Sequence, residues 1–130
     1  MAVTRTRRTL LGALSLWAPP LALMAVIFAL SAQPDLSSGL GTADLILRKI
    51  AHMAEYGLLV FLWWRALRTV AAGRAAVAAA VAIAVVYAAS DEWHQSFVEG
   101  RHGTPVDVMI DAVGMAAVAW LILRRGSERG

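Results

Sequence analysis

Long apolar segments alternate with short polar ones along this chain. The first apolar segment runs from Leu10 to Leu30 and carries no charge over its 21 residues, and about 20 apolar residues suffice for a helix to cross a bilayer. Pro19 and Pro20 lie inside it, and helices in lipid tolerate such prolines. The pattern predicts an all-α fold, an integral membrane bundle of four transmembrane helices at about 10–30, 45–68, 75–98 and 105–123, in one domain of residues 1–130.

Polar residues mark the expected helix ends. The segment 33–44 reads as a loop, with Asp44 as a candidate N-cap of the second helix. Thr104, Pro105 and Asp107 form a start signal for the fourth, with a cap residue, a proline at the first helical position and an acid three residues after the cap. The third helix is rich in alanine, and small residues allow close packing in lipid, so we expect it in the middle of the bundle.

The first segment also resembles a secretory signal peptide, with arginines before it and small residues after it. The apolar part of a signal peptide is about 7–15 residues long, and this segment is longer, which favours a retained helix.

Composition supports a membrane protein. The chain is 59% apolar and 16% charged, against roughly 45–50% and 25% in soluble domains. A core this small cannot hide so much apolar surface. There is no cysteine, which excludes disulfides and thiolate chemistry. The net charge of +3 does not indicate nucleic-acid binding, because the basic residues lie between apolar segments and form no stripe.

The basic residues predict the orientation of the bundle. One side of the predicted topology carries nine of them and the other carries three, Arg48, Lys49 and Arg101. Because the side richer in Lys and Arg faces the cytoplasm, we expect a multi-pass protein of the cell membrane with both termini inside. The lipid bilayer is then the expected partner of its apolar surface.

The acidic residues and histidines gather on the opposite, outer side. Lys49, His52 and Tyr56 share one face of the second helix by their spacing, as Asp107 and Asp111 do on the fourth. Asp91, Glu92 and Gln95 lie at the outer end of the third. Ionisable groups in bilayer helices face the interior and pair. The sequence therefore predicts a shared polar pocket at the outer membrane interface.

Several polar residues on the outer side also have an ordinary structural explanation. Asp107 could simply complete the cap of the fourth helix, and Lys49 could extend to lipid headgroups. His94 and His102 are expected to be solvated loop residues. The four that are hardest to explain in this way, and the candidates for catalysis, are His52, Asp91, Glu92 and Asp111.

The same residues carry a resemblance to a known family. The segments FALSAQP, KIAHMAEYGLL, YAASDEWHQSFVEGR and DVMIDAVG resemble the VanZ-like family of small bacterial membrane proteins, named for a protein linked to teicoplanin resistance. The chain departs from the family pattern at Ala32 and Glu99. The resemblance implies a role in the cell envelope and in antibiotic resistance of the glycopeptide type. It implies these substrate-binding residues, with Gln33 as a weaker match: Lys49, His52, Tyr56, Asp91, Glu92, Gln95, Arg101, Asp107 and Asp111.

Several functions fit these residues. The first is the binding or modification of a polar envelope component, such as a headgroup or a lipid-linked glycan. The second is an enzyme in which His52 is the general acid or base, Asp111 orients it, and Arg101 or Lys49 holds an anion. A metal site lacks a tight ligand motif, so we expect no metal and no cofactor. A transporter is disfavoured because the cytoplasmic helix halves are apolar. Ligand, reaction and oligomeric state stay open.

Overall fold

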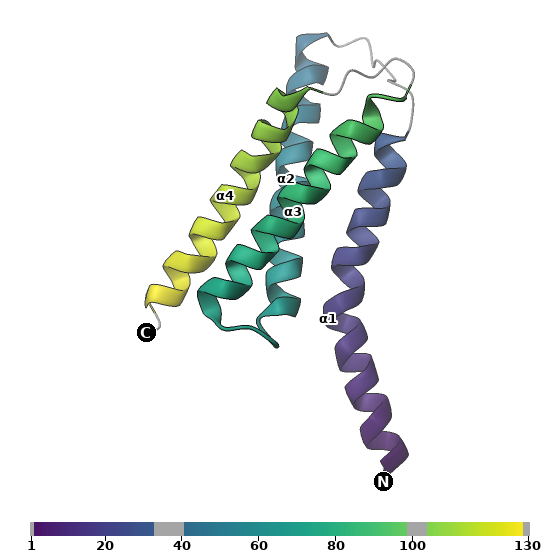
Figure 1. Ribbon diagram of the computed structural model, residues 1–130, viewed down its shortest axis with the longest axis vertical. Coiled ribbons are helices and arrows are strands. Elements are labelled where there is room, and N and C mark those ends of the chain that lie inside the picture. Colours follow the sequence, from purple (N-terminus) through teal and green to yellow (C-terminus); the bar gives the residue numbers. More distant parts are fainter. Residues whose placement is uncertain (1, 33–40, 99–103, 129–130) are drawn as a thin grey trace.

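The computed structural model describes residues 2–32, 41–98 and 104–128, and within them all regular structure is helical. The four helices are α1 (Ala2–Ser31), α2 (Thr42–Leu67), α3 (Gly73–Gln95) and α4 (Pro105–Glu128). They run up and down in one bundle, so that the start of α1 and the end of α4 lie at the same end (Figure 1). The predicted all-α bundle of four helices is confirmed.

Several helices begin or end at other residues than the sequence predicted. The helix α1 starts at Ala2, ahead of the apolar segment, and continues through Pro19 and Pro20. The helix α4 continues past Leu123 to Glu128. The helix α3 ends at Gln95, short of the predicted Val98, where the backbone changes to bonds between residues three apart, such as Phe97 N–H to the carbonyl of His94. Such tightening is common at helix ends.

The prediction that Asp44 caps the second helix is wrong. Gly41 occupies the cap position with a φ of 58°, a conformation that glycine adopts without steric cost. Asp44 lies in the first turn and pairs with Arg48, whose Nε is 3.1 Å from its carboxylate. The start of α4 fits the prediction better, because the Thr104 hydroxyl donates to Asp107 at 3.1 Å.

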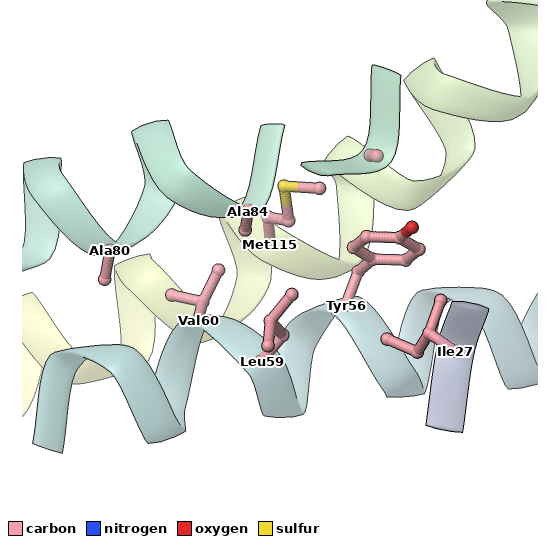
Figure 2. Packing of buried hydrophobic residues seen from close by; sticks show 8 residues of the cluster. Ile27, Tyr56, Leu59, Val60, Ala80, Ala84 and Met115 are labelled. Atoms are coloured by element: carbon pink, nitrogen blue, oxygen red, sulfur yellow. The ribbon is translucent and has the colours of Figure 1, made fainter. Parts of the chain in front are cut away.

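The helices α2 and α3 form the middle of the bundle. Each packs against all three other helices, whereas α1 and α4 make no direct packing contact within the described segments. The expected central position of the alanine-rich helix is therefore confirmed, and α2 shares it. Four alanines spaced one turn apart, Ala76, Ala80, Ala84 and Ala88, are fully buried. Around them the core consists mainly of Tyr56, Leu59, Val60 and Met115, joined by Ile27 from α1 (Figure 2).

A glycine crossing holds α2 and α4 together. A methyl group built on Gly114 would lie 2.8 Å from the carbonyl carbon of Met53, and one on Gly57 would meet the side chain of Val118 at 3.0 Å. Only glycine allows the two backbones to come this close, as in other helix pairs in lipid. The crossing lies about one turn from the polar residues described below.

The outer surface of the bundle suits lipid. Large apolar side chains are exposed along the helices, for example Leu14, Val26, Val86 and Val113, and a surface of this kind needs a nonaqueous surrounding. Among the described helices α1, α3 and α4 are long and apolar enough to cross a membrane. The helix α2 is not among these three, and it runs alongside them in the same bundle (Figure 1).

Candidate functional site

Two contacts join the polar face of α2 to α4. The ammonium of Lys49 pairs with the carboxylate of Asp107. One turn further on, Nδ1 of His52 lies 3.5 Å from Oδ1 of Asp111. The spacing of the residues explains the arrangement, because positions 49 and 52 and positions 107 and 111 each share one helix face. The contact between His52 and Asp111 is the more buried of the two, since the side chain of Asp111 is only 3% exposed.

A third contact joins the same face of α2 to α3. The hydroxyl of Tyr56, which is completely buried, donates to Oδ2 of Asp91 at 3.3 Å. The amide of Gln95 donates to the same oxygen at 3.3 Å. Asp91 is therefore held from α2 and from its own helix. The ring of Tyr56 also packs close to the ring of Tyr87, with 6.5 Å between the two ring centroids.

These residues are called the polar cluster from here on. It comprises eight of the nine predicted substrate-binding residues, namely Lys49, His52, Tyr56, Asp91, Glu92, Gln95, Asp107 and Asp111. The cluster lies at the end of the bundle opposite the arginines of α1 and of the α2–α3 turn (Figure 1). The ninth residue, Arg101, lies outside the described residues, as do Gln33, Glu99 and His102.

Two buried carboxylate oxygens in the cluster are unpaired. Oδ1 of Asp91 and Oε2 of Glu92 accept no hydrogen bond from the described part of the chain. The two side chains belong to residues that are only 4% and 8% exposed. The carboxylate of Glu92 lies beside the backbone N–H of Thr104 at the start of α4, where a helix favours negative charge. Buried polar atoms are almost always paired, so these two oxygens are suited to a donor from elsewhere.

The structure corrects the expectation for His94. It is not a solvated loop residue, because it lies on the last turn of α3 and its ring stacks on Phe28 of α1 with 4.4 Å between centroids. Its Nδ1 is buried and has no partner in the described residues. His94 thus joins α1 to the end of α3, beside the polar cluster.

Two further residues belong beside the cluster, although sequence reasoning gave them no role there. Ser31 at the end of α1 is 3% exposed and lies beside the carboxylate of Asp91, while its hydroxyl donates to the backbone carbonyl of Ile27 at 2.7 Å. Thr104 contacts both Glu92 and Asp107. A signal for Ser31 existed, because it stands in the FALSAQP segment, but its distance in sequence from Asp91 concealed the contact.

The composition of the cluster determines what it can bind. Its four carboxylates face one ammonium and one imidazole, so that acceptors outnumber donors. Three or more metal-binding side chains arranged around a common point are not found in the described segments. The groups present are therefore suited to a hydrogen-bond donor or a cation as ligand, and His52 beside Asp111 is the one pair with the form of an oriented general base.

Comparison with known protein families gives a match over most of the chain. The family model described as VanZ/LLP1 matches residues 6–125, which is nearly the whole chain. No curated protein and no solved structure matches.

Proposed function

The chain belongs to the VanZ/LLP1 family, and on this premise we propose that its polar cluster binds a polar component of the cell envelope at the outer leaflet of the membrane. The orientation is part of the proposal. Basic residues of α1, of the α2–α3 turn and of the end of α4 lie at one end of the bundle, and such an end faces the cytoplasm. The polar cluster at the other end then faces the outside.

The oxygens of Asp91 and Glu92 that have no donor among the described residues carry this proposal. A buried acceptor without a donor costs roughly 1–3 kcal/mol, and more when it is charged. A purely structural network would satisfy these atoms internally, as it does for the other oxygen of Asp91 through Tyr56 and Gln95. A ligand that brings its own N–H or O–H groups recovers the cost.

This chemistry favours a ligand rich in donors. Glycan hydroxyls, amide N–H groups and ammonium groups all donate to carboxylates, whereas a bare phosphate would be repelled by them. A lipid-linked glycan or an amino-bearing headgroup fits, because its lipid part lies in the bilayer beside the helices. The family name adds the expectation that such binding protects the cell against teicoplanin-type glycopeptides.

The test neutralises the two carboxylates without changing their volume. Asp91→Asn and Glu92→Gln replace an acceptor oxygen by a donor amide, and we expect normal amounts of membrane-inserted protein together with loss of protection against teicoplanin in a host that carries the gene. Asp44→Asn is the matched control, because Asp44 is an acid at the same end of the bundle that pairs with Arg48 away from the cluster. Full protection in both cluster variants at normal protein levels contradicts the proposal.

An enzymatic function is the second candidate, and the contact between His52 and Asp111 supports it. A histidine held by a buried carboxylate is the arrangement of a general base and its orienting group. An enzyme changes the mass of an envelope lipid or glycan, and His52→Gln abolishes that change. Mass spectrometry of envelope lipids from cells with and without the gene tests this. Protection without any new species rules out modification and leaves binding.

A further inference from the structure

A groove lies at the arginine-rich end, between α2 and α4 and away from the polar cluster. It has a volume of about 380 Å³. Phe61 and Val118 give it an apolar lining, and Trp64, Arg68 and Arg125 line it nearer the C-terminal ends of α2 and α4. The proposed function does not use this groove.

The two arginines line the groove from different helices. Arg68 caps the end of α2, with its guanidinium carbon 4.7 Å from the centre of the Trp64 ring, and such stacking fixes the position of a cation. Arg125 lies in the last turn of α4. Among the described residues no acidic side chain lines the groove.

The groove has charged residues near the end of the bundle and apolar residues deeper in it, as a phospholipid has a charged headgroup and apolar acyl chains. Phe61 precedes Arg68 by two turns of α2, which is roughly 10 Å along the helix axis. Arg68 and Trp64 are residues typical of the membrane interface, and Phe61 and Val118 then lie at the depth of the first methylene groups of an acyl chain. Basic pockets between transmembrane helices bind anionic headgroups.

We propose that this groove binds one anionic phospholipid, with its phosphate between Arg68 and Arg125 and one acyl chain along Phe61 and Val118. The arginines select for net negative charge, because a zwitterionic lipid brings an ammonium group toward two guanidinium groups. In the proposed orientation the lipid belongs to the cytoplasmic leaflet, but the binding itself does not depend on the orientation.

Native mass spectrometry of the purified full-length protein tests the site, with phosphatidylglycerol and phosphatidylcholine as probes in parallel titrations. We expect one phosphatidylglycerol to bind more tightly than phosphatidylcholine. The double variant Arg68→Gln/Arg125→Gln weakens the binding of phosphatidylglycerol at least about tenfold. The matched control is Arg7→Gln/Arg8→Gln, which removes the same charge from the same end of the bundle, but on α1, and it leaves the binding unchanged.

A third variant tests the groove and not the charge. Leu121→Trp adds bulk on the α4 side of the groove and keeps both arginines, so we expect it to weaken binding too. Equal loss in the α1 control shows general charge attraction and overturns the proposal, as does equal binding of the two lipids. A dimer lost in the groove variants, with lipid binding retained, means that a second copy of the chain occupies the groove and also overturns it. None of these results depends on teicoplanin protection.

Discussion

The three contacts on the polar face of α2 differ in burial, and therefore in the stability they provide. The side chains of Lys49 and Asp107 are 35% and 21% exposed, and ion pairs of this kind contribute roughly 0–1 kcal/mol. Asp111 is almost completely buried beside His52. Losing one partner of a buried pair is costly because the other is left uncompensated.

Double-mutant cycles measure this difference. We expect a coupling free energy above about 1 kcal/mol for His52→Gln with Asp111→Asn, and a smaller one for Lys49→Gln with Asp107→Asn. Unfolding of the four single and two double variants in detergent by a chemical denaturant gives both values. The pair of Lys49 and Asp107 is the internal control, since it joins the same two helices. A larger coupling for this pair would show that burial does not set the strength of these contacts.

The sequence predicted most of the residues of the cluster, and the enzyme hypothesis placed Asp111 beside His52, but the other contacts were not predicted. Periodicity placed Lys49, His52 and Tyr56 on one face, because helical spacing is a local property. It could not show that Tyr56 meets α3 while the other two meet α4, since that depends on how the helices are packed. The contact of Ser31 with Asp91 depends on packing in the same way.

At the scale of the helices, the crossing at Gly57 and Gly114 controls the site. It keeps α2 and α4 close about one turn from the contact between His52 and Asp111. Hydrophobic periodicity could not predict it, because a glycine in an apolar helix gives no sign of which helix it faces. The ends of α1 and α4 were mispredicted for a related reason, since hydropathy marks the lipid-covered part of a helix and not its full length.

Gly114→Ala should separate these two helices. The added methyl group meets the backbone of Met53, which cannot move aside as a side chain can, and overpacking of this kind costs roughly 1–3 kcal/mol. We expect a lower unfolding temperature in detergent and weaker protection against teicoplanin at equal protein level. Gly12→Ala is the control, because a methyl group there meets nothing within 4 Å. Equal stability of the two variants would mean that α2 and α4 adjust at no cost.

For the whole molecule, the main question is how α2 is kept in the membrane. By hydropathy it is not among the helices that can span on their own. Its charged face is covered by Asp91 of α3 and by Asp107 and Asp111 of α4. Because paired polar groups are tolerated inside a bundle, α2 depends on its neighbours, and the polar cluster is at once part of the fold and the proposed site.

The orientation of the bundle is the last prediction. The chain has no cysteine, so that a single introduced cysteine reports one position. Val70 in the turn after α2 and Phe97 after α3 lie at opposite ends of the bundle and are equally exposed, at 72% each. With the arginine-rich end inside, a membrane-impermeant maleimide added to intact cells labels Phe97→Cys, and it labels Val70→Cys only after the membrane is permeabilised. The unaltered chain gives the background. The reverse pattern would turn the polar cluster toward the cytoplasm and rule out a ligand of the outer leaflet, while labelling of both positions in intact cells would show that α3 does not cross the membrane.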